Sequence, residues 1–177
     1  MLLDIDVSKI LIETERLILR PLNESDLFNF ELLIKYNDLD KNWKTEEKVN
    51  KYYTTLITTI SSKDTLALVL KENQRIIGSI LFGSLQNDDD LLSSAFFGRG
   101  LGYMLDKNYW GRGFMPEAVK GVIDYCFNRL NFDFLMCAYK CDNLQSKRVI
   151  EKCGFKFYKT QNASNLILNV IYKNEIE

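Results

Sequence analysis

Apolar residues change their spacing partway along this 177-residue chain, and the change marks a strand, a loop and a helix in succession. The run from Leu101 to Leu105 predicts a strand, which ends at the polar turn 106–108. Beyond a pair of glycines, apolar residues recur at steps of three and four, which is one face of an α-helix: Val119, Val122, Ile123, Cys126, Phe127 and Leu130. Pro116 is expected at the first helical position, where its missing N–H removes no intrahelical bond.

The remaining pattern predicts a sheet with helices. Apolar runs predict strands at 14–20, 66–70, 75–85, 132–139, 155–159 and 166–172. Helical stripes predict helices from the caps at 23–26 to about residue 36, over 45–60 and over 144–152. The strands at 66–70 and 75–85 should pair as an antiparallel hairpin. This order predicts an α/β (α+β) fold: a single mixed sheet, mostly antiparallel, with helices on both faces, in one domain over residues 1–177.

The glycine pair at 111 and 113 lies between the strand and the helix. Glycine lets backbone N–H groups turn outward without a Cβ in the way. The start of the helix adds N–H groups that lack intrahelical partners, together with a partial positive charge. Strand, glycine loop and helix start therefore predict an anion site, most often one for phosphate. The alternative is that Gly111 and Gly113 only close a tight turn.

Composition and charge limit the classes of molecule that we expect this chain to bind. Lys and Arg number 23 against 24 Asp and Glu, so the net charge of −1 offers no broad basic surface for nucleic acid. No apolar run approaches the roughly 18 residues that span a bilayer. The first ten residues, MLLDIDVSKI, carry early acids and lack the basic start of a secretory signal. We therefore expect a cytoplasmic location, with neither a nucleic-acid nor a membrane partner.

The side-chain chemistry is limited by the absence of histidine. Without histidine, Ser-His and Cys-His nucleophile schemes are excluded, and a zinc site would need thiolates or carboxylates alone. The four cysteines, Cys126, Cys137, Cys141 and Cys153, form no C-x-x-C pair, and three of the four fall at apolar positions of predicted elements. We expect buried reduced thiols and no metal.

Three segments, taken in order, resemble a known family. The runs TERLILRPLNESDL, GYMLDKNYWGRGFMPEAV and NLQSKRVIEKCGF are similar to the GNAT superfamily of acyl-CoA-dependent N-acetyltransferases, and within it to the RimJ/RimL branch that acetylates ribosomal-protein N-termini. The resemblance covers residues 14–172. It implies acetyl-CoA as the donor, an amine as the acceptor, and direct transfer without an acyl-enzyme.

The resemblance also implies where acetyl-CoA binds. In the family, the strand equivalent to residues 102–105 splays from the next parallel strand, and the pantetheine arm pairs with its backbone, here that of Met104 and Leu105. The loop would hold the pyrophosphate through N–H groups of Gly111, Arg112, Gly113, Phe114 and Met115. Asn143 would bind the pantetheine arm. The residues alone favour another role for Asn143, as the cap of the helix that follows it.

Three hydroxyls are candidates for catalysis, that of Ser146 and, as alternative donors, those of Tyr103 and Tyr139. By resemblance, Ser146 lies near the sulfur and gives the leaving thiolate a proton. The residue types alone favour a solvent-facing Ser146. Tyr103 abuts the expected thioester site and is an alternative donor, although a tyrosine in the core is an equal explanation. Lys147, Arg148 and Lys152 could reach the CoA 3′-phosphate, but a solvated helix face explains them equally well.

Two departures from the family pattern concern charge and base. Trp110 and Gly111 stand where the family often has Gln or Arg, so Arg112 would supply the local positive charge. Neither the strand 101–105 nor the turn 160–164 carries a carboxylate base. We expect transfer to a protein or peptide N-terminal α-amine by a monomer or homodimer. The alternatives are a small-amine acetyltransferase, for which the acidic run 88–90 would suit a polyamine, and a non-catalytic CoA-binding module.

Overall fold

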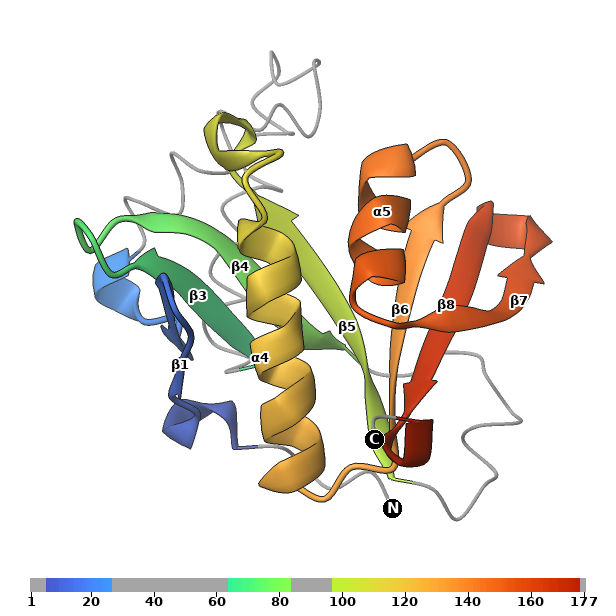
Figure 1. Cartoon of the computed structure of the whole chain (residues 1–177), viewed down its shortest axis with the longest axis horizontal. Coiled ribbons are helices and arrows are strands. Elements are labelled where there is room, and N and C mark those ends of the chain that lie inside the picture. The colour runs from blue at the N-terminus through green and yellow to red at the C-terminus, as the bar shows by residue number, and fades with distance from the viewer. Residues whose placement is uncertain (1–5, 27–63, 84–96, 176–177) are drawn as a thin grey trace. The chain divides into compact units, whose positions relative to one another are not determined.

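The computed structural model describes residues 6–26, 64–83 and 97–175 (Figure 1). The helices predicted to residue 36 and over 45–60, and the acidic run 88–90, lie outside these residues. The strands are β1 (Ile12–Glu13), β2 (Leu17–Pro21), β3 (Thr65–Leu70), β4 (Ile76–Gly83), β5 (Gly98–Leu105), β6 (Phe134–Lys140), β7 (Lys156–Gln161) and β8 (Leu166–Tyr172). The described α-helices are α4 (Phe114–Asn128) and α5 (Leu144–Lys152), and short 3-10 turns include η3 (Lys107–Tyr109).

The strands form one mixed sheet in the order β1-β2-β3-β4-β5-β6-β8-β7. The pairs β1–β2, β2–β3, β3–β4, β6–β8 and β7–β8 are antiparallel, whereas β5 and β6 are parallel. The predicted mixed, mostly antiparallel sheet is therefore confirmed. So is the hairpin of β3 and β4, whose register runs from Thr65 opposite Leu81 to Val69 opposite Ile76.

Two compact units are described separately, and β4 and β5 contribute residues to both. One unit contains β1, β2, β3, residues 76–81 of β4, and residues 103–114. The chain after β5 is tied to β4, because the Asp106 N–H donates to the Ile77 carbonyl at 2.8 Å. This unit contains a buried apolar cluster of Leu22, Ala67, Val69 and Ile76. Ile18 and Met104 pack against the cluster. Met104 of β5 is thus held by apolar packing within this unit.

The second unit comprises residues 82–102 and 115–177. It contains α4 from Met115, β6, α5, β7 and β8, with α5 beside β6 (Figure 1). One face of α4 is buried, as the three-and-four spacing predicts: Ala118, Val119, Val122, Ile123, Cys126 and Phe127. The Cys153 thiol, at the end of α5, donates to the Pro116 carbonyl in the first turn of α4 at 3.6 Å.

Several elements differ from the prediction at their boundaries, and three of the differences have a clear cause. Helix α4 begins at Phe114, so Pro116 is its third residue and not its first. The first four N–H groups of a helix all lack intrahelical partners, so the third position tolerates proline as well. Strand β5 begins at Gly98, because pairing with β6 extends it through Arg99 and Gly100, which break the apolar run. Strand β1 has two residues and is too short to leave a pattern.

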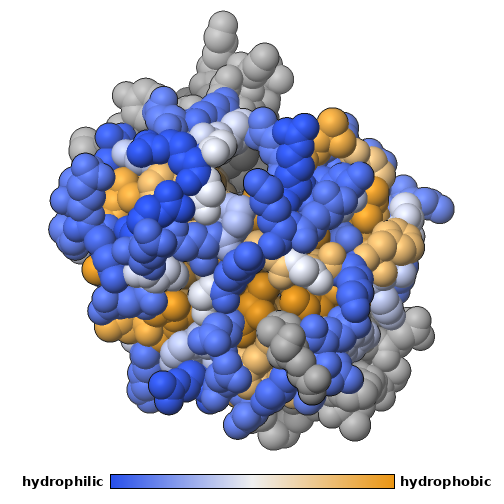
Figure 2. All heavy atoms as spheres, in the orientation of Figure 1, coloured by the Kyte–Doolittle hydropathy of each residue, from blue (hydrophilic) through white to orange (hydrophobic). Residues whose placement is uncertain are grey.

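Polar residues cover most of the face shown in Figure 2, with apolar residues gathered in smaller groups. The large apolar side chains that are exposed include Trp110 of the glycine loop and Phe157 of β7. Among residues 6–26, 64–83 and 97–175, no helix has both the length and the apolar character needed to cross a bilayer.

Candidate functional site

The glycine loop is built on a capped turn. The Asp106 carboxylate accepts hydrogen bonds from the backbone N–H of Asn108 at 2.9 Å and from its Nδ2 at 3.0 Å, which fixes the start of η3. Gly111 and Gly113 then adopt φ angles of 74° and 80°. An L side chain in this left-handed region costs roughly 1–2 kcal/mol. Both glycines are thus needed for the path of the backbone, and the tight turn that the sequence left as an alternative is present.

Aromatic rings and guanidinium groups surround the loop. The Tyr109 and Phe114 rings meet edge to face, with centroids 5.9 Å apart. The Arg112 guanidinium lies 5.5 Å from the Tyr109 centroid and 5.2 Å from that of Phe114. Arg16, from the turn before β2, lies 4.3 Å from the Phe114 centroid. Two positive charges therefore stand at the loop, although the chain as a whole has a net charge of −1.

This donor set fits an anion with several oxygens. Gly111, Arg112 and Gly113 are exposed, and a Cβ on Gly111 would meet no heavy atom within 4 Å. The loop leads directly into α4, a helix of 15 residues whose first turn adds partial positive charge. The Phe114 and Met115 side chains are buried, so only their backbone groups could meet a ligand. Glycine amides, a helix start and two guanidinium groups are the usual means by which proteins bind phosphates.

The backbone carbonyls at the end of β5 already have neighbours. The Leu105 carbonyl accepts a hydrogen bond from Trp110 Nε1 at 2.8 Å. The Met104 carbonyl faces β4 so closely that a Cβ on Gly78 would collide with it. A ligand that pairs with this stretch would have to use backbone N–H groups or the second lone pair of the Leu105 oxygen. Tyr103 is half-buried in the same strand.

Parallel pairing of β5 with β6 is short. It joins Gly98 to Phe134 and continues as far as Leu101 opposite Cys137. Strand β5 runs on to Leu105, and β6 runs on to Lys140, where it pairs with β8. Among the described residues, the β5–β6 register therefore covers half of β5.

Asn143 caps α5. Its Oδ1 accepts a hydrogen bond from the Ser146 N–H at 3.0 Å, so the capping role that the sequence offered is present. Ser146 is half-buried in the first turn of α5, not fully exposed as the solvent-facing alternative would have it. The catalytic role of Ser146 and the ligand-binding role of Asn143 stay predictions.

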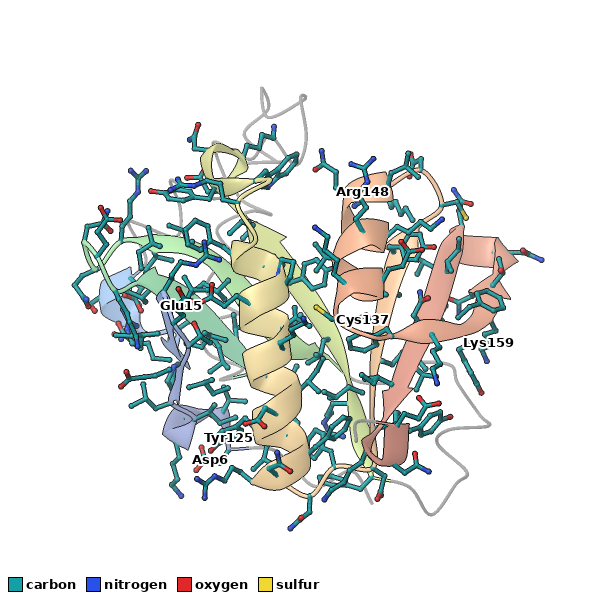
Figure 3. The ribbon with its side chains drawn as sticks, in the orientation of Figure 1. Asp6, Glu15, Tyr125, Cys137, Arg148 and Lys159 are labelled. Carbon is teal, nitrogen blue, oxygen red and sulfur yellow. The ribbon has the colours of Figure 1, made fainter. Side chains whose placement is uncertain are left out.

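The basic residues of α5 line a solvated helix face. Arg148 is exposed on this helix (Figure 3). Lys147 pairs with Glu151 one turn later, with 3.7 Å between Nζ and Oε1. Exposed pairs of this kind contribute little to stability. Exposure on a charged helix surface therefore explains these residues without a ligand.

The buried thiols are inert. Cys126, Cys137 (Figure 3) and Cys153 are buried and form no disulfide, whereas Cys141 is exposed. Burial raises the pKa of Cys126 and Cys137 well above the ordinary value, and that of Cys153 to about 11. These three groups stay neutral thiols at neutral pH, as the apolar spacing predicted. In the part of the chain that the structure describes, no group of three or more Cys, Asp or Glu residues is arranged to hold a metal ion.

The predicted residues divide between the two units. Tyr103, Met104, Leu105 and the loop from Gly111 to Phe114 belong to one unit, and the structure brings them together through η3 and Trp110. Met115, Asn143 and Ser146 belong to the other. Sequence analysis missed Arg16, which contacts the loop directly. No local signal could have found it, because its partner lies 96 residues away along the chain.

A mixed sheet whose central strand leads through a phosphate-type glycine loop into a helix is the architecture of acyl-CoA-dependent transferases, and comparison with known proteins agrees. The profile of the acetyltransferase (GNAT) domain matches residues 16–156. The chain belongs to the GNAT family, which uses acetyl-CoA, and the resemblance noted in the sequence is confirmed.

Individual relatives are more distant. The probable N-acetyltransferase YjcK of Bacillus subtilis is 39% identical over 84 residues, which cover 47% of this chain and 42% of that protein. The chain thus matches about half the length or less of the first curated relatives. The ribosomal-protein-S5-alanine acetyltransferase of Vibrio fischeri superposes with a TM-score of 0.67 at 22% identity, covering 96% of this chain and 100% of that one. Mycobacterium smegmatis RimJ, solved with CoA-disulfide, gives 0.72 at 16% identity, covering 94% and 89%. These likenesses confirm the predicted fold.

Proposed function

We propose that this protein is an N-acetyltransferase that transfers the acetyl group of acetyl-CoA directly to a primary amine, in particular the N-terminal α-amine of a protein or peptide. The observation that carries the proposal is the loop at 111–114, with its two left-handed glycines, its two guanidinium groups and the start of α4. Membership of the GNAT family supports acetyl-CoA as the anion's source.

Acetyl-CoA would bind to the glycine loop through its diphosphate and to the end of β5 through its pantetheine arm. Backbone N–H groups of Gly111, Arg112, Gly113, Phe114 and Met115 would bind the diphosphate, and Arg112 would add positive charge. Backbone groups of Met104 and Leu105 would pair with the pantetheine arm, as would the Asn143 side chain. Acetyl-CoA supplies the thioester that the amine attacks. No metal takes part in this scheme.

The reaction requires a neutral amine and a protonated leaving group. The amine nitrogen forms a bond to the thioester carbonyl carbon, the carbon–sulfur bond breaks, and the sulfur takes a proton from the Ser146 hydroxyl. Tyr103 is the alternative donor. The ammonium gives one proton to water before it attacks, and after the attack the nitrogen gives its second proton, through water, to the Ser146 oxygen, which restores the hydroxyl. Ser146 would hold the proton in place, and its position one turn after the Asn143 cap would fix its backbone.

The acceptor preference follows from the lack of a carboxylate in the strand 101–105 and in the turn 160–164. An α-amine has a pKa of about 8 and a lysine of about 10.4, so deprotonation to water at neutral pH costs about 3 kcal/mol less for an N-terminus. An enzyme without a carboxylate beside its acceptor would therefore favour N-termini over lysines. The ribosomal-protein-S5-alanine acetyltransferase of Vibrio fischeri, which shares the fold, is named for a protein acceptor, and this supports a protein acceptor here.

The decisive test is an acceptor screen with acetyl-CoA, with the acetylated product measured by mass spectrometry because Cys141 is an exposed thiol that would react with thiol reagents. The panel should contain a lysine-free peptide with a free N-terminus, the same peptide blocked at its N-terminus and carrying one lysine, and a polyamine. We expect acetylation of the first peptide. Acetylation of the polyamine alone would replace the protein acceptor with a small amine. If no amine gave a product, the protein would be a non-catalytic CoA-binding module.

The proton donor is tested by Ser146→Ala. We expect kcat to fall by at least about tenfold, while the affinity for acetyl-CoA changes little, because a general acid acts in the transition state. Ser164→Ala is the matched control, since Ser164 is an exposed serine of the turn between β7 and β8. An unchanged kcat in Ser146→Ala would remove Ser146 from the mechanism and direct attention to Tyr103.

A further inference from the structure

Arg16 lies in the turn between β1 and β2, next to Glu15, which Figure 3 labels. The backbone of this turn is held on both sides. The Arg16 carbonyl accepts a hydrogen bond from the Lys71 N–H at the end of β3 at 3.0 Å, and the Leu17 N–H donates to Thr14 Oγ1 at 3.1 Å. These hydrogen bonds therefore fix the backbone position of Arg16 relative to β3.

The Arg16 side chain reaches from this point to the glycine loop. Its Nη1 donates to the Arg112 carbonyl at 3.0 Å. Its guanidinium carbon lies 4.3 Å from the centre of the Phe114 ring, and Phe114 is itself 4% exposed. A Cβ on Gly113 would lie 3.5 Å from Arg16 Nη2. One guanidinium thus contacts three successive residues of the loop.

The hydrogen bond to the Arg112 carbonyl also orients an amide. The Arg112 carbonyl and the Gly113 N–H belong to the same peptide unit, and no described peptide bond is cis. In a trans peptide the C=O and N–H point in opposite directions. Because Arg16 holds the carbonyl toward itself, the Gly113 N–H points away from Arg16. This N–H is one of the groups expected to meet the diphosphate.

We propose that Arg16 is a positioning residue for the diphosphate of the donor: it fixes the Arg112–Gly113 peptide so that the Gly113 amide faces the phosphates. The inference rests on the proposed function for the identity of the anion. The role needs a guanidinium, because a planar group can donate from its edge to a carbonyl while its face lies on an aromatic ring. A lysine ammonium is a compact point charge and cannot make both contacts in this way.

Arg75 offers a matched comparison. Its guanidinium carbon lies 6.0 Å from the Tyr109 centroid, and its Nη2 lies 4.0 Å from Asp106 Oδ2. Arg75→Met thus removes one positive charge from the same unit while the hydrogen bond from Arg16 to the loop backbone stays in place.

The experiment is titration calorimetry with CoA on the wild-type protein, Arg16→Met, Arg16→Lys and Arg75→Met. Loss of a charged hydrogen bond that orients a binding group should weaken CoA binding by about tenfold or more in Arg16→Met. Arg16→Lys should be weakened similarly, and Arg75→Met should stay within about threefold of the wild type. Wild-type affinity in Arg16→Lys would show that charge alone suffices and would overturn the proposal, as would wild-type affinity in Arg16→Met.

Acetyl-pantetheine, a donor without the diphosphate, separates positioning from general damage to the fold. Arg16→Met should use it as well as the wild type does, while its KM for acetyl-CoA rises. Equal losses with both donors would overturn the positioning role.

Hydrogen exchange of the ligand-free protein tests, independently of CoA, whether Arg16 holds the loop. Backbone amides at 106–114 should exchange faster in Arg16→Met, and unchanged exchange would overturn the proposal. A wild-type protein that binds no CoA would overturn the proposed function, whereas the exchange result would still decide whether Arg16 holds the loop.

Discussion

Substituting Gly78 by alanine should force β4 and β5 apart at the end of β5, where the loop begins. Gly78 is buried in β4, and an added Cβ would collide with the Met104 carbonyl oxygen and lie 3.3 Å from both Cα and Cδ1 of Leu105. The first obstacle is backbone, which cannot rotate away as a side-chain tip can. The strand that carries Met104 and Leu105 must therefore move as a whole.

The magnitude follows from the cost of overpacking. Inserting a methyl group into a packed site costs typically 1–3 kcal/mol. Alanine also loses less backbone entropy on folding than glycine, which offsets about 0.4–1 kcal/mol. We expect Gly78→Ala to lower the free energy of unfolding by about 1–2 kcal/mol in urea titrations. CoA affinity should fall too, because β5 leads into the loop through the Asp106–Ile77 hydrogen bond.

Gly83→Ala is the control on the same strand. A Cβ on Gly83 would lie 3.9 Å from the Gly100 carbonyl oxygen, which is ordinary contact. This variant should be neutral or slightly stabilised, with CoA affinity unchanged. Equal stabilities for the two variants would refute the close approach of β5 to Gly78, and with it our account of why β4 carries glycine there.

Two further predictions concern the loop and the buried thiols. Gly113→Ala should weaken CoA binding, and Gly113→Asn should weaken it less, because the φ of 80° is strained for alanine and better tolerated by asparagine; equal affinities in calorimetry would contradict this. Because burial raises the pKa of Cys126, Cys137 and Cys153, the folded state keeps protons that the unfolded state loses above about pH 9. The free energy of unfolding should therefore fall as pH rises from 9 toward 11, by about 1.4 kcal/mol per pH unit for each thiol. In urea titrations Cys153→Ala should make this fall shallower than it is in the wild type; equal slopes for the two proteins would contradict the assignment.

The sequence predicted those features that depend on neighbouring residues. Helix α5 was predicted with the bounds that the structure has, because Asn143 and Gly154 mark its two ends. The glycine loop was predicted because Gly111 and Gly113 stand between an apolar strand and the start of a helical stripe. Contacts between segments that are far apart in the sequence leave no pattern in the spacing of apolar residues. The contact of Arg16 with the loop and the approach of Met104 to Gly78 depend on how strands register, which the period of apolar residues does not encode.

Two side chains hold the loop and the end of β5 through carbonyl oxygens, and one of these bonds favours the predicted anion site. Trp110 donates to the Leu105 carbonyl, and Arg16 donates to the Arg112 carbonyl. The N–H of the Leu105–Asp106 peptide unit donates to the Ile77 carbonyl, so the bond from Trp110 orients no amide toward a ligand. The bond from Arg16 turns the N–H of the same peptide unit, that of Gly113, the opposite way. Under the proposed function, a chain with a net charge of −1 would therefore form a local diphosphate site by orienting the Arg112–Gly113 peptide unit, with Arg16 and Arg112 as the charges beside it.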